Sequence, residues 1–324
     1  MEQIFYSSDS VIIYYSAIVI TLGIAAGLFF SYSLYASAGG NRLGYCVMII
    51  PAVFLSVIFS RILHWYCHAE QYSSLYSALT NYANGGFVLS GVFAGVILAV
   101  LLVRLLRLCD SAARLFDCLA PGMCLTFSFI RLSSLFNYSC RSKISIENAD
   151  YQRLPFAASF TDAGGVSEYR FAVFFAEFVV LLILFILITV FYFRHSSEKS
   201  CEHGSTANMF ISWYSAIEMM ADSTRYDSSF AQFNGFISVV QMVCAAILVF
   251  VLVFYSIRYV KKSGIRRAIP LWVLFLVALG ITGVSEYLVQ RHGNWYLSCY
   301  FAMAIGCFGM AGINDVVRRR ALSI

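Results

Sequence analysis

The chain of 324 residues has few charged side chains for its length. Asp, Glu, Lys and Arg together make up 12% of it, whereas 60% of the residues are hydrophobic. So few charged groups could not cover the apolar surface of a water-soluble fold, which excludes that class. The mean hydropathy of +0.77 and the 17% aromatic content instead predict an all-α, polytopic transmembrane protein, with Tyr and Trp at the membrane interfaces.

Two further patterns are missing. None of the ten cysteines stands in a Cys-x-x-Cys pair, so the sequence does not indicate a metal centre, and most cysteines are interpreted as small hydrophobic residues among helices. The first ten residues contain no Lys or Arg and therefore lack the basic region of a cleaved signal peptide. We expect the first hydrophobic helix to be retained.

Long hydrophobic runs predict a bundle of membrane-spanning helices. A span needs about 20 apolar residues, and we expect nine such helices. The segment near residue 214 is the shortest, so it sits in a thinned part of the membrane or is surrounded by other helices. The nine segments are residues 11–35, 44–64, 86–106, 115–136, 170–193, 207–221, 232–257, 269–289 and 294–313.

Basic residues fall in alternate connections between these segments. If the N-terminus is outside and the C-terminus inside, all of these connections lie on one side of the membrane. The positive-inside rule therefore predicts nine spans with that orientation and places the polar residues 138–169 in an outer loop. The basic groups are Arg42, Arg104 to Arg114, Arg194 to Lys199, Arg258 to Arg267, and Arg318 to Arg320.

Three arginines lie within or at the outer ends of the predicted spans: Arg61, Arg131 and Arg225. A charged side chain inside a membrane segment costs roughly 2.5 kcal/mol or more, so each arginine needs a partner or access to water. Each one could reach the interface or pair with a carboxylate such as Glu218 or Asp227. Alternatively, the three arginines gather near the outer leaflet and bind the phosphate of a phospholipid, because a guanidinium can grip phosphate bidentately.

The second and third segments carry further candidate groups. Arg61, His64 and His68 recur at a spacing that places them on one helical face. They are either a base beside an anion site or part of an aromatic and imidazole belt at the interface. Gly91 and Gly95 lie four residues apart, which allows two helix backbones to approach closely.

Several short motifs, in the same order, resemble the prolipoprotein diacylglyceryl transferase family. The clearest stretch runs from Gly85 to Asn137 and ends in Phe-Ile-Arg131-Leu-Ser-Ser-Leu-Phe-Asn137, which is similar to the family's Gly-Arg-x-Gly-Asn-Phe-x-Asn signature. Tyr15 and Arg61 lie in stretches similar to the motifs of its first two helices. Residues 218–241 are similar to its Glu-x-x-Arg-x-Asp and Ser-x-x-Gln elements. The resemblance covers about residues 11–258.

The chain departs from the family pattern in several places. Ser90 stands where the third helix of the family has a histidine, Ser134 replaces the central asparagine of the signature, and Tyr214 stands in place of an arginine. Two hydrophobic segments follow residue 268, beyond the family's usual seven. We therefore expect a family-like membrane domain over residues 1–258, with the outer loop at 138–169, and an extra helical pair with a basic tail over residues 259–324.

The resemblance implies transfer of a diacylglyceryl group from phosphatidylglycerol to the lipobox cysteine thiol of a prolipoprotein, with formation of a thioether. This reaction belongs to the outer leaflet of a bacterial plasma membrane. The expected partners are phosphatidylglycerol and the prolipoprotein signal peptide, and no nucleic acid. No metal or cofactor is expected, because arginines supply the positive charge for the leaving phosphate.

Residue roles follow from the same resemblance. Arg131 and Arg225 bind the phosphate, with Arg61 in support. Because Ser90 replaces the histidine, the general base is left open between His64, His68 and a Glu218 in apolar surroundings that favour proton uptake. The other residues expected to contact substrate are Tyr15, Ser90, Gly91, Asn137 and Asp227.

Two alternatives to an active enzyme stay open. A catalytically silent relative would keep the anion site and bind phospholipid or lipoprotein signal peptides, and the loss of the histidine at Ser90 favours this reading. A small-molecule or ion transporter is the weaker alternative, because the sequence shows neither a repeat nor clear pairs of broken helices.

Overall fold

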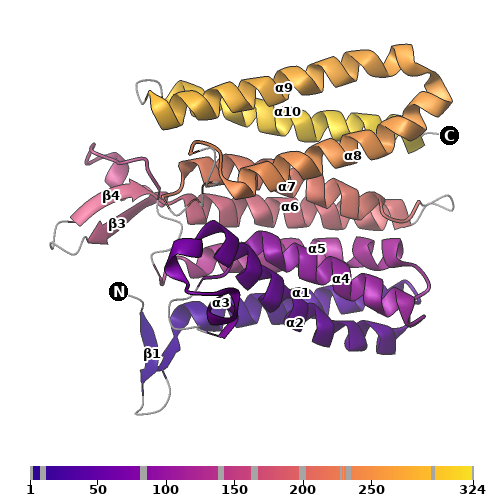
Figure 1. Cartoon of the computed structure of the whole chain (residues 1–324), viewed down its shortest axis with the longest axis horizontal. Coiled ribbons are helices and arrows are strands. Elements are labelled where there is room, and N and C mark those ends of the chain that lie inside the picture. The colour runs from indigo at the N-terminus through magenta and orange to yellow at the C-terminus, as the bar shows by residue number, and fades with distance from the viewer. Residues whose placement is uncertain are drawn as a thin grey trace.

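The computed structural model describes residues 3–7, 12–80, 86–137, 142–161, 167–196, 202–226, 228, 230, 235–292 and 296–322. These residues form a bundle of long helices with two antiparallel β-hairpins at one end (Figure 1). The helices are α1 (Tyr15–Ser37), α2 (Arg42–Cys67), α3 (Leu75–Thr80), α4 (Leu89–Leu105), α5 (Ala112–Ser133), α6 (Val173–Ser196), α7 (Ser205–Thr224), α8 (Val239–Ser263), α9 (Ile265–Arg291) and α10 (Tyr296–Leu322). The hairpins pair β1 (Ile4–Ser7) with β2 (Ile12–Tyr14), and β3 (Ala157–Thr161) with β4 (Ser167–Phe171).

The all-α membrane class is confirmed. Among the described residues, seven helices are long and apolar enough to cross a membrane: α1, α2, α5, α6, α8, α9 and α10. The helix α4 is apolar but has only 17 residues, and α7 does not meet the same criteria. The N- and C-termini lie at opposite ends of the bundle (Figure 1). The count of nine spans and the side of the membrane that each end faces stay predictions.

The helix α7 differs from its prediction. It has 20 residues rather than the 15 of the predicted segment, and it is more polar than a lipid-facing helix. Packing against α5, α6, α8 and α10 buries most of its side chains. Of the two predicted arrangements, the structure therefore favours a helix surrounded by its neighbours, since shielding from lipid removes the need for an apolar surface.

Two glycines of α4 bring this helix into backbone contact with α2. A Cβ atom added at Gly91 would lie 2.4 Å from the Cα of Ser60, and one at Gly95 would lie 2.3 Å from the backbone nitrogen of Ser56. The helices α2 and α4 can pack this closely only because both positions lack a side chain. The packing interpretation thus accounts for Gly91, which is buried in this contact.

The last two helices join the same bundle. Buried residues of α7 and α8 form one hydrophobic cluster with residues of α9 and α10, including Leu248, Phe275 and Met303. In Figure 1, α9 and α10 cover the side of the bundle formed by α7 and α8. The hydrophobic core is therefore continuous across the predicted domain boundary at residue 258.

Candidate active site

Four charged side chains meet at the hairpin end of the bundle, where three helices converge. Arg131 lies in the last turn of α5, Glu177 near the start of α6, and Glu218 near the end of α7. Arg225 directly follows the last residue of α7. All four are 7% exposed or less, so they are shielded from water and from lipid.

The four side chains form a closed ring of alternating charge. Arg131 reaches Glu177 through Nε (2.7 Å to Oε2) and Glu218 through Nη2 (2.5 Å to Oε1). Arg225 reaches Glu218 through Nη1 (3.0 Å to Oε1) and Glu177 through Nη2. The two guanidinium and two carboxylate charges of the ring cancel, and Oδ1 of the buried Asp222 lies 3.9 Å from Nη1 of Arg225 as a third carboxylate beside it. This balance is what makes burial tolerable, since one unpaired buried ion costs several kcal/mol.

The backbone around Arg225 is held by the connection between α5 and α6. Arg225 leaves the helical conformation (φ −89°, ψ 152°) and pairs with Ser142 as an isolated antiparallel bridge. The amide of Lys143 donates to the carbonyl of Thr224 at 2.8 Å. The loop and α7 together therefore set the point from which the Arg225 side chain turns back into the bundle.

The predicted Ser-x-x-Gln element has a structural role. Ser238 and Gln241 form a capping box at the start of α8, in which each side chain bonds the backbone of the other residue at 3.0 Å. The Gln241 amide also donates to the carbonyl of Met219 at 3.5 Å. This element therefore ties the first turn of α8 to the last turns of α7.

Arg61 lies in a separate group of contacts. Its Nε donates to the carbonyl of Ala78 at 2.8 Å, and its Nη1 donates to the carbonyl of Gly86 at 3.0 Å. Arg61 is only 1% exposed. Backbone carbonyls of the connection between α2 and α4 thus satisfy this guanidinium locally. These contacts differ from those of Arg131 and Arg225 and agree with a structural role for Arg61. The gathering of all three arginines around one phospholipid phosphate stays a prediction.

The histidines of α2 belong to the Arg61 group. The rings of His64 and His68 stack with centroids 4.4 Å apart, which confirms that they share one face of the helix. The Tyr72 hydroxyl lies 3.1 Å from Nδ1 of His64. Gly86 has a positive φ of +89°, and an added Cβ would lie 2.8 Å from His64 and from Arg61. The base role of either histidine stays a prediction.

Glu218 does not have the apolar surroundings that its predicted base role requires. Two guanidinium groups contact its carboxylate, and the Tyr214 hydroxyl donates to Oε2 at 3.1 Å. Nearby opposite charges and donated hydrogen bonds stabilise the ionised form of a carboxylate. The prediction about its environment is therefore wrong, because the sequence does not reveal which helices bring arginines next to α7.

Two other residues predicted to contact substrate, Tyr15 and Ser90, lie at the starts of α1 and α4. Tyr15 begins α1, and its ring stacks on Phe136 with centroids 5.6 Å apart. The structure thus brings the first-helix motif next to the end of the signature, at Asn137. Ser90 lies in the first turn of α4 and is partly buried. Asp227 lies outside the described residues.

Glu177 was not among the predicted site residues, although it contacts both arginines of the ring. A signal for it exists in the sequence. It is the single acidic residue of α6, in a run of apolar residues, and a carboxylate within a membrane segment needs a partner for the same reason as an arginine. The same argument that singled out Arg131 would have found it.

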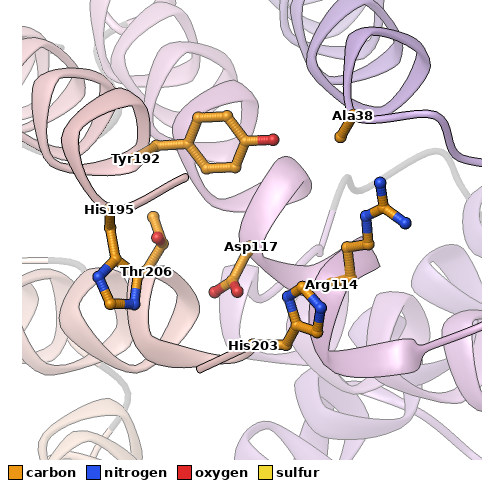
Figure 2. Close-up of a pocket in the computed structure, with 7 residues that line it drawn as sticks. All are labelled: Ala38, Arg114, Asp117, Tyr192, His195, His203 and Thr206. Carbon is orange, nitrogen blue, oxygen red and sulfur yellow. The ribbon is translucent and has the colours of Figure 1, made fainter. Parts of the chain in front are cut away.

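A cavity of about 390 Å³ lies at the opposite ends of the same three helices. Figure 2 shows Asp117 of α5 at its centre, with Tyr192 of α6 and Thr206 of α7 around it. The Asp117 carboxylate accepts hydrogen bonds from the backbone amides of Gly204 (2.5 Å) and Ala207 (2.9 Å). Asp117 therefore caps the N-terminus of α7, and none of the predicted site residues lines this cavity.

The fold and the buried ion ring define a multi-pass membrane protein with a charged site at one end of its helical bundle. The family model for prolipoprotein diacylglyceryl transferase matches residues 3–257, most of the chain. The protein belongs to this family, which confirms the resemblance found in the sequence, and it is thereby related to membrane transferases of lipoprotein biosynthesis. A comparison with curated proteins gives no match.

Proposed function

We propose that this protein transfers a diacylglyceryl group from phosphatidylglycerol to the thiol of a lipobox cysteine. Besides family membership, one observation supports this proposal. Arg131 and Arg225 come from segments almost a hundred residues apart, yet both contact the same two carboxylates. Two guanidinium groups held this close together can bind one phosphate between them.

The reaction makes two chemical demands. The thiolate sulfur attacks the glyceryl carbon that carries the phosphate. A C–S bond forms, the C–O bond to phosphate breaks, and glycerol phosphate leaves with the bonding electrons. The proton of the thiol must pass to a base, and the charge on the leaving phosphate must be stabilised. In our proposal, Arg131 and Arg225 meet the second demand.

The ion ring also supports an assignment for the base. In this structure Glu177 and Glu218 each contact two guanidinium groups, so neither carboxylate is a good proton acceptor. When a substrate phosphate takes over part of this contact, Glu177 or Glu218 loses a cationic partner and becomes able to accept the thiol proton. This exchange makes the base available only when lipid is bound, and it replaces the histidine that is absent at Ser90.

The remaining assignments belong to the same proposal. The hairpin end of the bundle faces the outside of a bacterial plasma membrane, and the C-terminus faces the cytoplasm, as the basic connections predict. Tyr15 and Asn137 orient the lipid by hydrogen bonds. The sequence resemblance gives Ser90 and Asp227 a role in substrate binding as well. Gly91 contributes through close helix packing.

The test uses purified protein in nanodiscs that contain phosphatidylglycerol, together with a lipobox peptide, and detects the thioether by mass spectrometry. The variant Arg131→Lys should lose roughly 100-fold or more in rate, because a lysine cannot contact both carboxylates and a phosphate as the guanidinium does. The matched control is Arg42→Lys, an exposed arginine at the start of α2. A wild-type rate for Arg131→Lys would remove the phosphate assignment.

The same assay identifies the base. Glu177→Gln and Glu218→Gln are compared with His64→Gln and His68→Gln, and the base is the residue whose loss removes the rate without preventing lipid binding. A binding protein without catalysis is the second candidate, since Ser90 stands in place of the histidine of the family. It predicts that the wild-type protein binds phosphatidylglycerol or the peptide but forms no thioether at any pH.

A further inference from the structure

The helix α9 reaches the candidate site although it lies beyond the residues that the family model matches. Its Glu286 is only 3% exposed. The Ser223 hydroxyl of α7 donates a hydrogen bond to Oε2 of Glu286, and the Gln290 amide donates to Oε1 at 2.9 Å. A buried carboxylate from the C-terminal helical pair is thus bonded to the last turn of α7.

The loop between α5 and α6 completes this connection. The Lys143 ammonium donates to Oε1 of Gln290 at 3.2 Å and to the carbonyl of Ser223 at 3.5 Å. Burial lowers the pKa of Lys143, and the charges of Glu286 and Asp222 oppose that shift. The loop, the end of α7 and the end of α9 therefore share one network of hydrogen bonds and charges.

The network surrounds the residues that aim Arg225 into the ion ring. Ser223 and Thr224 are the last residues of α7, and Arg225 is the first with an extended backbone. Glu286 and Lys143 bond Ser223 and Thr224 directly, one or two positions before Arg225. The direction of the Arg225 side chain depends on where this backbone is held.

Packing alone does not account for Glu286. An apolar side chain at this position would fill the space between α7 and α9 without the cost of burying a carboxylate in a membrane helix. Unlike an apolar side chain, the Glu286 carboxylate accepts hydrogen bonds from Ser223 and Gln290, and it lies close to the charge of Lys143.

We propose that Glu286 is a positioning residue of the active site, and that the extra pair α9–α10 holds the end of α7 so that Arg225 meets Glu177 and Glu218. This inference rests on the proposed function for its effect on catalysis. Its structural part, that Glu286 determines the conformation at residues 223–226, is independent of that function.

The test compares three variants of the full chain in phosphatidylglycerol nanodiscs. Glu286→Leu should lower kcat about tenfold or more, because a small displacement of a catalytic group has a large effect on rate, and should leave KM for the lipobox peptide unchanged. Glu286→Gln can still accept the Ser223 hydrogen bond and should recover most of the rate. The matched control is Thr282→Val, one turn earlier on α9, whose buried hydroxyl donates to the carbonyl of Ala278 in its own helix and lies 4.0 Å from the sulfur of Cys307. It should behave as wild type.

A second measurement does not depend on activity. Tyr226 follows Arg225 and lies against the guanidinium of Arg170, 4.7 Å from ring centroid to Cζ. The ¹⁹F resonance of 3-fluorotyrosine at position 226 should shift in Glu286→Leu, return in Glu286→Gln, and stay unchanged in Thr282→Val. If Glu286→Leu does not fold, Ser223→Ala removes the same hydrogen bond with little change in volume and should shift the resonance in its place.

The outcomes separate this proposal from the proposed function. An unshifted resonance in a folded Glu286→Leu or Ser223→Ala variant overturns the positioning role. A shifted resonance with wild-type kcat also overturns it, since the displacement would then not reach Arg225. If the wild-type protein forms no thioether, the proposed function fails, and the ¹⁹F resonance alone decides whether Glu286 holds the end of α7.

Discussion

Buried charges are balanced in different ways at the two ends of α5, α6 and α7. At the hairpin end, Arg131 and Arg225 are balanced by Glu177 and Glu218. At the other end, about 21 Å away along α5 at 1.5 Å per residue, Asp117 is balanced by backbone amides at the start of α7. The first arrangement pairs side chains with side chains, and the second uses the positive end of a helix.

This difference separates a candidate active site from a structural cap. Guanidinium groups held by carboxylates can exchange those partners for a phosphate, because both anions offer oxygens to the same donors. The amides that bond Asp117 already have their carboxylate within the fold, and releasing it would uncap α7. The cavity at the Asp117 end (Figure 2) is therefore a weaker indicator of chemistry than the tightly packed ion ring.

Removing one member of the ring should have the largest effect on stability. Arg225→Met removes one of the two guanidinium groups that hold Glu177 and Glu218, and it also takes away a cation 3.9 Å from Asp222. The buried carboxylates are then left with excess negative charge, which should lower the free energy of unfolding by about 3–5 kcal/mol. A denaturant titration followed by tryptophan fluorescence measures this loss. The double variant Arg225→Met with Glu177→Gln removes one of the excess negative charges and should recover part of this loss. If Arg225→Met lowers the free energy of unfolding no more than Arg42→Met does, the ion pairs of the ring do not contribute to stability.

Removing the carboxylate at the opposite end should have a medium effect. Asp117→Asn keeps one acceptor oxygen but loses the charge and one of the two bonds to α7, so it should lower the free energy of unfolding by about 1–2 kcal/mol. The rate per folded molecule should stay at the wild-type value in the thioether assay. A loss of rate without a loss of stability would assign the Asp117 end a part in the chemistry and erase the contrast between the two ends.

The smallest effect is expected at the rim of the cavity. The Arg114 guanidinium lines the cavity and is partly exposed, so Arg114→Gln should change the free energy of unfolding by about 0.5 kcal/mol or less. Both the unfolding titration and the thioether assay should give values close to wild type. A destabilisation as large as that of Asp117→Asn would show that Arg114 balances the carboxylate and that this end also depends on paired side chains.

Much of the helical architecture could be predicted because it depends on local hydrophobicity. Each of the nine predicted segments overlaps one long helix of the structure, from α1 at one end of the chain to α10 at the other. The polar helix α7 is the instructive exception. Its predicted length was too short, because a search for apolar residues leaves out polar residues such as Ser205 and Asp222 at the ends of the helix. Packing among four other helices allows these polar residues to belong to a buried helix.

The candidate site was only partly predictable. The motif order led to Arg131 and Arg225, and the structure brings these two together on shared carboxylates. Arg61 was grouped with them because it lies at a similar predicted depth. Depth does not define neighbours, however, and Arg61 bonds the carbonyls of Ala78 and Gly86 instead.

Family membership, the membrane class and the approximate helix positions follow from the amino-acid sequence by itself, because motif order and runs of apolar residues are properties of neighbours along the chain. The tertiary structure alone decided that Glu177 closes the ion ring, that Glu218 is flanked by arginines, and that Glu286 reaches the end of α7. These pairings join helices far apart in the chain. They depend on which faces of the helices meet, and hydrophobicity along one helix does not determine that choice.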